Sequence, residues 1–193
     1  MERLEYFSRY FNDCKNVLDI GCGDGIFLEI MKKKGISATG VDISKDVVDG
    51  CLKKGLNVVC ADAFQFLKDK SGTYDGVIIS NLIEHLQPAQ VEELLAKSFT
   101  SLKSNGIVLV AVPDPKNIKD IFGDFWEDPT HVRLYPLNVL NKMFKAAGFI
   151  VEKSIEKKYD YPKLLWKIRD ALRNAFIGPY WGRSELYFVA RKK

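Results

Sequence analysis

A short apolar run that ends in an acid and then meets three alternate glycines constrains this chain more than any other feature. Residues 17–25 read VLDIGCGDG. Glycine lets the main chain adopt torsions that side chains forbid and approach a ligand closely. A helix that begins after such a turn directs its unpaired N–H groups and its positive dipole end at the turn. We therefore predict a strand, a turn and a helix that together hold a ligand through the backbone.

The turn departs from the fingerprint of nicotinamide dinucleotide sites, which is G-x-G-x-x-G or G-x-G-x-x-A. The residue three positions after Gly23 is Ile26, where that fingerprint needs a small side chain. A nicotinamide-dependent oxidoreductase is therefore disfavoured.

Three successive predicted strands end in carboxylates, at Asp19, Asp42 and Asp62. An acid at the end of the second strand suits the two hydroxyls of a ribose. An acid after the third strand can accept a hydrogen bond from an exocyclic amine such as that of adenine. One aspartate at a strand end is most often merely solvated, but three of them beside a glycine turn indicate a nucleoside site.

Apolar runs alternate along the chain with amphipathic helical stretches, which is typical of a parallel sheet with helices on both faces. The predicted strands cover residues 16–20, 37–42, 57–61, 74–80, 106–112, 149–157 and 185–192. The predicted helices cover residues 2–12, 25–34, 45–54, 88–103 and 137–147. The sequence thus predicts a doubly wound α/β fold. Ligands of such sheets gather at the carboxyl ends of the strands, where the three acids would lie.

Five segments resemble the ordered motifs of the class I S-adenosylmethionine-dependent methyltransferases. They read LDIGCGDG, GVDIS, CADAF, YDGVIISNLIEHL and SLKSNGIVLVAVP, and they extend from Val17 to about Pro113. No single motif is specific, but the ordered set is. The resemblance implies a Rossmann-like methyltransferase fold with a mostly parallel seven-stranded sheet, whose final antiparallel strand would be residues 185–191. It also implies S-adenosyl-L-methionine as cofactor and S-adenosyl-L-homocysteine as product.

The same resemblance implies roles for residues at the strand ends. Asp19, Gly21 and Gly23 would surround the methionyl part of the cofactor. Asp42 would hold the ribose and Asp62 would read the adenine amine. The remaining implied cofactor residues are Ile43, Ala63, Phe64, Ser80 and Asn81. Phe64 would lie against the purine or, as readily, in the core.

At 193 residues, the chain is expected to form a single methyltransferase domain over residues 1–193. Its strong apolar runs are too short to span a bilayer, and its charged start is unlike a secretory signal. The four cysteines, Cys14, Cys22, Cys51 and Cys60, have neither CxxC nor zinc-site spacing. We therefore expect reduced thiols, a cytoplasmic location and no metal site.

The net charge of +4 is concentrated near one end of the sequence. Residues 151–193 carry 11 basic and 5 acidic side chains, whereas the rest of the chain carries 18 and 20. The body is thus close to neutral, which disfavours a broad nucleic-acid track across it.

Part of this basic region is an expected insertion at about residues 159–183, between the last two strands. Within it, residues 163–177 have the apolar spacing of an amphipathic helix, with lysines and arginines on the other face. Such a helix would pack against its own domain or a second subunit, as in a homodimer. Alternatively, it would dock to an anionic or membrane-surface partner, or to RNA.

Methyl transfer from a sulfonium is an in-line displacement, so the protein mainly aligns the acceptor and excludes water. A hydroxyl acceptor must also lose a proton, and histidine is the natural base. The chain has two histidines, His85 and His131, both on predicted loops beside the expected methyl position. Both are candidate catalytic residues. The alternative for each is a hydrogen bond that only orders its loop.

Residues 128–135 resemble a D-x-x-H-x-R-x-Y loop found in a subset of methyltransferases, often in carbohydrate or cell-envelope settings. The dipeptide at residues 84–85, Glu-His, is common in small-molecule methyltransferases. The candidate substrate residues are Trp126, Arg133 and Tyr135. Arg133 would bind a carboxylate or phosphate of the acceptor, or pair with Asp128.

The sequence therefore predicts methyl transfer to a small polar acceptor, with an oxygen of a sugar or related metabolite as the first choice. One alternative is a tRNA or rRNA methyltransferase that uses the basic C-terminal region. Against it, residues 80–83 read SNLI, where base methyltransferases carry an N-P-P-Y-type motif. The other alternative is a protein that binds S-adenosylmethionine without catalysis.

Overall fold

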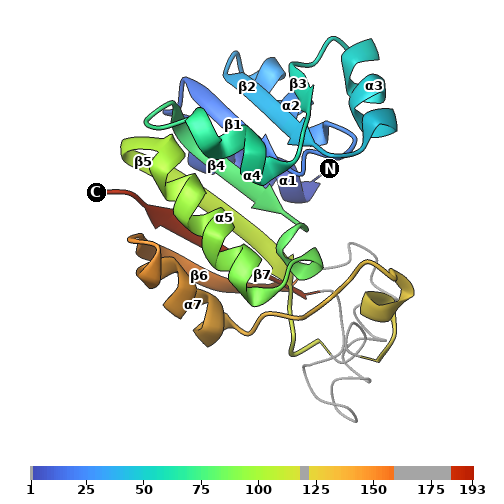
Figure 1. Ribbon diagram of the computed structural model, residues 1–193, viewed down its shortest axis with the longest axis vertical. Helices are drawn as coiled ribbons and strands as arrows, with labels where there is room; N and C mark the ends of the chain where they lie inside the picture. The colour runs from blue at the N-terminus through green and yellow to red at the C-terminus, as the bar shows by residue number, and fades with distance from the viewer. Residues whose placement is uncertain (1, 118–121, 159–183) are drawn as a thin grey trace, which may run out of the picture.

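The described residues of this computed structural model, 2–117, 122–158 and 184–193, are built around one seven-stranded sheet (Figure 1). Its strands are β1 (Asn16–Ile20), β2 (Ser37–Asp42), β3 (Val58–Cys60), β4 (Tyr74–Ser80), β5 (Leu102–Pro113), β6 (Ile150–Lys158) and β7 (Ser184–Arg191). Their order is β3-β2-β1-β4-β5-β7-β6. The first five strands pair in parallel, and β7 is antiparallel to both of its neighbours. The predicted mixed sheet with a final antiparallel strand is confirmed.

Helices cover both faces of the sheet. They are α1 (Glu2–Ser8), α2 (Ile26–Lys33), α3 (Lys45–Lys53), α4 (Ala63–Phe66), α5 (Pro88–Ser101) and α7 (Leu137–Ala146). Single 3-10 turns are η1 (Arg9–Phe11), η2 (Leu67–Asp69), η3 (Ile83–His85) and η4 (Asp124–Glu127). None of the helices in this part of the chain has the length and apolar character needed to cross a membrane.

Alternate residues of the central strands enter two different cores. Val77 and Ile79 of β4 join the core under α5 and α7, whereas Ile78 joins the core under α1 and α2. This alternation follows from the two-residue period of a strand. It explains why the central strands read as continuous apolar runs, since both of their faces are buried.

The observed elements differ most from the sequence-based expectation near residue 102, and one short helix was not predicted. α5 ends at Ser101 because the chain enters β5 at once, where Leu102 pairs with Tyr74 of β4. The one-turn helix α4 was not predicted, because four residues are too few for a helical period to show. The predicted insertion at 159–183 and its helix at 163–177 lie outside the described residues.

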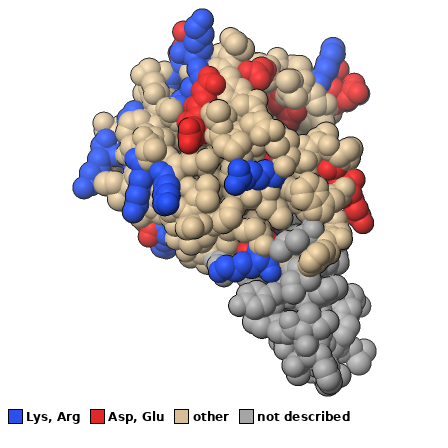
Figure 2. Space-filling model, turned by 60° about the horizontal axis from the view of Figure 1, so that its bottom comes forward, with Lys and Arg blue, Asp and Glu red and all other residues tan. Residues whose placement is uncertain are grey.

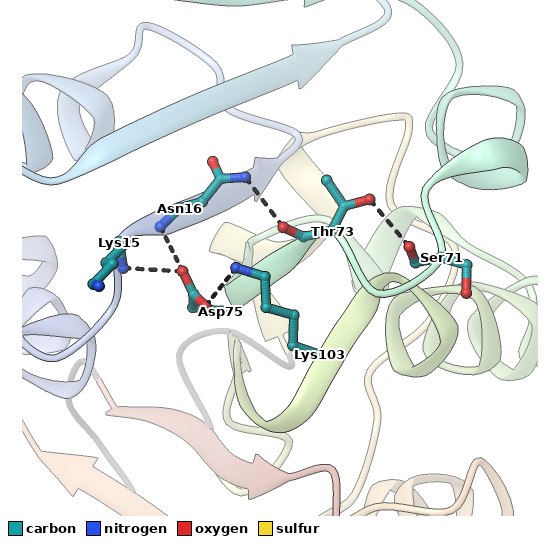
Figure 3. A network of polar contacts seen from close by, with 6 residues as sticks. All are labelled: Lys15, Asn16, Ser71, Thr73, Asp75 and Lys103. Atoms are coloured by element: carbon teal, nitrogen blue, oxygen red, sulfur yellow. Dashed lines mark hydrogen bonds and ion pairs between the residues drawn. The ribbon is translucent and has the colours of Figure 1, made fainter.

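A network of polar contacts joins the amino ends of β1 and β4, at the end of the sheet opposite the glycine turn (Figure 3). One carboxylate oxygen of Asp75 accepts hydrogen bonds from the backbone N–H groups of Lys15 and Asn16, at 3.0 and 2.8 Å. The other oxygen accepts from Nζ of Lys103 at 2.8 Å. Burial opposes ionisation of Asp75, but these hydrogen bonds outweigh it and lower the pKa of the carboxyl.

We expect Asp75→Ala to lower the free energy of unfolding by about 2 kcal/mol, because two backbone donors and one ammonium lose a charged acceptor. Chemical denaturation at pH 7 measures this loss. The matched control is Asp49→Ala on α3, whose ion pair with Lys45 is exposed and should contribute less than about 0.5 kcal/mol. Equal losses of unfolding free energy in the two variants would show that the hydrogen bonds of Asp75 do not stabilise the fold more than an exposed ion pair does.

Candidate active site

The candidate site lies beside β1, where the order of the strands in the sheet changes direction: the chain adds β2 and β3 on one side of β1 and then β4 and β5 on the other. β1 lies between β2 and β4 in the sheet. After β1 the chain passes to α2, which covers one face, and after β4 it passes to η3 and α5, which cover the other. The two connections thus diverge, and in open α/β sheets such a divergence leaves a crevice at the carboxyl ends of the strands.

The three glycines of the first connection all have left-handed torsions, with φ values of 71°, 50° and 75° at Gly21, Gly23 and Gly25. A Cβ atom at Gly25 would lie 2.6 Å from Leu56 and 2.8 Å from Sγ of Cys51, so close packing requires glycine there. At Gly23 a Cβ atom would meet nothing within 4 Å. Gly23 is therefore the glycine beside open space, where a ligand can approach the main chain.

Asp42 connects the end of β2 to this turn. One of its carboxylate oxygens accepts from the N–H of Gly23 at 3.0 Å, and the other accepts from the N–H of Ser44 at 2.9 Å. Each carboxylate oxygen has a second lone pair that can accept from a ligand hydroxyl. Asp42, which is predicted to bind the ribose, therefore stabilises the glycine turn through its hydrogen bond with Gly23.

Asp19, at the end of β1, is a buried carboxyl with 4% of its surface exposed. No donor among the described residues forms a hydrogen bond with its side chain. Burial, with a further contribution from the charge of Asp42, raises the pKa of Asp19 to about 7. A positively charged ligand group beside Asp19 would reverse this shift.

Residues around the third strand form the next part of the site. Asp62 caps α4, because one of its oxygens accepts from the N–H of Gln65 at 3.0 Å, and the other oxygen is left for a ligand. Ala63 is the first residue of α4, a position whose N–H has no partner within its helix. Ile43 is 74% exposed, whereas Phe64 is partly buried and packs against the core.

The side chains after β4 contact a residue that sequence reasoning missed. Arg3 of α1 donates to Oγ of Ser80 at 3.1 Å, to Oδ1 of Asn81 at 3.0 Å and to the buried carboxylate of Glu185 on β7. The two predicted cofactor residues are therefore held by an arginine from the start of the chain. No local sequence signal could have found Arg3, because its partners lie 77 to 182 positions away.

The two histidines predicted as catalytic residues are in contact. His85 ends η3, directly after β4, and His131 belongs to the loop between η4 and α7. The carbonyl of Glu84 accepts from the N–H groups of Val132 and Arg133, at 2.8 and 3.1 Å, which fixes that loop over η3. As a result, the centroids of the two imidazole rings are 4.6 Å apart.

Hydrogen bonds determine which nitrogen of each ring carries the proton. Nδ1 of His131 contacts the carbonyl of Phe125, which can only accept, so Nδ1 donates. Nδ1 of His85 lies 2.8 Å from Oγ1 of Thr130, and that hydroxyl donates to Asp128 at 2.6 Å. Thr130 therefore accepts from His85. In the neutral rings, the lone pair of each histidine is at Nε2.

The surroundings of His85 disfavour the charged form of its ring. Burial, together with the proximity of His131, lowers the pKa of His85. Hydrogen bonds from Thr130 lower the pKa of Asp128. Next to the pair, the side chain of Glu84 is 1% exposed, and burial raises its pKa to about 8.

The three candidate substrate residues lie in different surroundings. Tyr135 is 1% exposed, and its hydroxyl donates to the carbonyl of Leu86 at 2.6 Å, so it holds the loop against the core. The guanidinium of Arg133 lies 5.6 Å from the centroid of the Tyr135 ring. Trp126 is 59% exposed. Contact of these residues with an acceptor stays a prediction.

Comparison with known proteins agrees with this geometry. A family model described as a methyltransferase domain matches residues 1–154. The crystal structure of an S-adenosylmethionine-dependent methyltransferase from Archaeoglobus fulgidus superimposes with a TM-score of 0.84 and 29% identity, over 99% of this chain and 92% of that one.

Similar curated sequences include two kinds of methyltransferase. A ubiquinone biosynthesis O-methyltransferase from Caulobacter vibrioides is 35% identical over 101 residues, which are 49% of this chain and 39% of that protein. A ribosomal RNA small subunit methyltransferase C from Chromohalobacter salexigens is 34% identical over 122 residues, 58% of this chain and 36% of that protein. The chain thus spans well under two thirds of the length of these relatives. From its matched family model and its fold, the chain belongs to the methyltransferase domain family and is an S-adenosylmethionine-dependent methyltransferase domain.

Proposed function

We propose that the protein transfers the methyl group of S-adenosylmethionine to an oxygen of a small polar acceptor, such as a sugar or a related metabolite. The observation that carries this proposal is the pair of touching imidazoles, His85 and His131, at the carboxyl end of β4. In the neutral rings each Nε2 has a lone pair, and His85 follows the predicted cofactor residues Ser80 and Asn81 at the end of β4. That arrangement suits an acceptor that must lose a proton.

The residues around the glycine turn fit the cofactor. Gly23 leaves room for the methionyl part to approach the backbone, and the unpartnered carboxyl of Asp19 suits its ammonium group. Asp42 has lone pairs left for the ribose hydroxyls, and Asp62 has one left for the adenine amine. When bound, the cofactor supplies a methyl group on a cationic sulfur, which is already activated for displacement.

The chain's own residues then have three tasks. The glycine turn and Asp42 orient the donor, and the loop over η3 covers the acceptor side and excludes water. His85 and His131 ease the loss of the acceptor's proton. Held in this way, the cofactor would supply its methyl carbon to the acceptor oxygen, and the departing sulfur would keep the electron pair of the broken carbon–sulfur bond.

A nucleic-acid acceptor is the second candidate, because one relative is named as a ribosomal RNA methyltransferase. Two observations favour the small acceptor over it. Several relatives are named as O-methyltransferases of ubiquinone biosynthesis. On the face shown in Figure 2, basic side chains are interspersed with acidic and uncharged surface instead of forming a continuous track.

A labelling experiment tests the proposal. The protein and methyl-labelled S-adenosylmethionine are incubated with a host extract, which is then separated into small molecules, lipid, RNA and protein. We expect label in the small-molecule fraction, bound through an ether oxygen, and none with Asp42→Ala. Label in RNA would overturn the proposal in favour of the second candidate.

The pKa of Asp19 makes cofactor binding depend on pH. Below pH 7 the carboxyl of the free protein is protonated, so a cationic ligand must displace that proton. We expect the Kd for S-adenosylmethionine to fall by up to about tenfold per pH unit as the pH rises from 5 to 7, and then to level off. Calorimetry in two buffers of different ionisation enthalpy measures both the affinity and the released proton.

Asp19→Asn is the variant that tests this linkage. In the unfolded chain the carboxyl ionises near its usual pKa of 3.8, whereas in the folded protein it ionises near 7. Wild-type stability must therefore fall as the pH rises between these values, since the unfolded state binds fewer protons there. At pH 7 we expect the free energy of unfolding of Asp19→Asn to exceed that of the wild type by about 4 kcal/mol. The variant should nevertheless bind the cofactor more weakly. Unchanged pH dependence in this variant would rule out Asp19 as the group responsible.

A further inference from the structure

Glu84, His85 and His131 bring three potential metal ligands together. One ligand atom from each of them, a carboxylate oxygen or a ring nitrogen, lies within 4.8 Å of the other two. Bonds of 2.0–2.2 Å to one ion place ligand atoms about 3–4 Å apart. Small side-chain rotations would therefore bring the three ligand atoms to the separations that one ion requires. The residues come from η3 and from the loop before α7, which their backbone hydrogen bonds hold together.

When Glu84 is ionised, these three groups are all acceptors, and no donor among the described residues bonds to the free ring nitrogens or to Oε2 of Glu84. The hydrogen bonds of Nδ1 to Phe125 and Thr130 leave each imidazole with a lone pair at Nε2. Oε2 of Glu84 is buried and has no hydrogen-bond partner within residues 2–117, 122–158 and 184–193. Nearby, Arg3 donates its hydrogen bonds to Ser80, Asn81 and Glu185. A buried carboxylate oxygen without a donor is costly, and a cation would compensate for it.

The surroundings of the histidines also match those of metal ligands. In metal sites, the second ring nitrogen of a ligating histidine usually donates to a carbonyl or a carboxylate, which fixes the ring. His131 donates to a carbonyl, and His85 reaches Asp128 through the hydroxyl of Thr130. Two imidazoles and one carboxylate favour a first-row transition ion over Mg²⁺ or Ca²⁺, which prefer oxygen ligands alone.

We propose that Glu84, His85 and His131 bind one divalent transition-metal ion of the Zn²⁺ or Co²⁺ class. Three protein ligands leave coordination positions open, and an acceptor hydroxyl beside such a cation loses its proton more readily. The proposal that the ion binds depends only on the positions of these three side chains. Its use in methyl transfer rests on the function proposed above.

Titration of EDTA-treated protein with Zn²⁺, and separately with Co²⁺, tests the site. Calorimetry and the Co²⁺ absorption spectrum report binding without any need for the acceptor. We expect one ion per chain, and we expect Glu84→Gln and His131→Ala each to weaken binding by more than about 100-fold. Thr130→Val removes the hydroxyl that bonds to His85 and to Asp128 but removes no proposed ligand, so it should weaken binding by only about tenfold.

Two control variants should bind the ion as the wild type does. Glu127→Gln removes an exposed acid near the same loop, and Cys60→Ser removes the exposed thiol. Thermal unfolding in EDTA shows whether each variant folds. Glu84→Gln should fold at least as stably as the metal-free wild type, since it removes a buried carboxyl whose Oε2 has no partner among the described residues. Zn²⁺ should raise the Tm of the wild type and of the two control variants, but not that of Glu84→Gln.

The outcomes separate this inference from the proposed function. Failure of the wild type to bind either ion, binding that survives in Glu84→Gln and His131→Ala, or loss in Cys60→Ser would each overturn the metal site. Such results would leave Glu84 as a carboxyl that is protonated in the folded protein, and cofactor binding would be unaffected. Metal binding together with label in RNA would instead refute the small-molecule acceptor and leave the site intact.

Discussion

Replacing His131 with alanine is expected to lower kcat by about 1,000-fold, because the acceptor hydroxyl loses the group that eases its deprotonation. The Kd for S-adenosylmethionine should change less than about twofold, since the predicted cofactor residues lie on other connections between strands and helices. Single-turnover transfer of labelled methyl to the acceptor fraction measures the rate, and calorimetry measures the affinity.

A second substitution at the same position separates chemistry from loop packing. The amide of His131→Gln can still donate to the carbonyl of Phe125, which accepts from His131 in the wild type. If the histidine only holds the loop, glutamine should restore the rate. We expect no restoration, whereas the control Glu127→Gln should retain the full rate. Full activity of His131→Ala would remove this residue from the chemistry.

Asp42→Ala should weaken S-adenosylmethionine binding by about 100-fold. Two hydrogen bonds from ribose hydroxyls to a carboxylate contribute about 3 kcal/mol in all, and each 1.4 kcal/mol corresponds to a factor of ten. The N–H groups of Gly23 and Ser44 also lose their acceptor, which should loosen the turn. Calorimetry at pH 7.5, where Asp19 is mostly ionised, gives the affinity.

The matched control for this substitution is Asp24→Ala, which removes an exposed acid from the same turn. It changes the local charge by the same amount but takes away none of the hydrogen bonds described for Asp42. We expect it to bind the cofactor within about twofold of the wild type, since an exposed charge is screened by solvent. Equal losses in the two variants would show that the charge of the turn matters and the ribose acceptor does not.

The sheet and its strand ends could be predicted because their signals are local. Apolar runs bounded by turn residues gave the positions of all seven strands within a few residues, and the observed order places the ends of β1, β2 and β4 together. The carboxyl ends of adjacent parallel strands necessarily share one edge. For that reason, the relation of Asp19 and Asp42 to the glycine turn followed from sequence position.

Contacts between distant loops could not be predicted in the same way. Arg3 looked like one of many surface cations, and nothing near it in the sequence marks Glu185 as its partner. The proton positions on His85 and His131 depend on Thr130 and Phe125, which only the folded loop brings close. Cysteine spacing gave no sign of the cluster with Glu84, because its members are two histidines and a glutamate from separate segments.

The ion pair between Arg3 and Glu185 also has a consequence for synthesis of the protein. The two residues are 182 positions apart in the sequence. At about 5–20 residues per second, a translating ribosome makes the arginine some ten seconds or more before its carboxylate partner. Throughout that interval Arg3 cannot form this ion pair. The nascent chain therefore cannot link α1 to β7 through it until translation has passed Glu185.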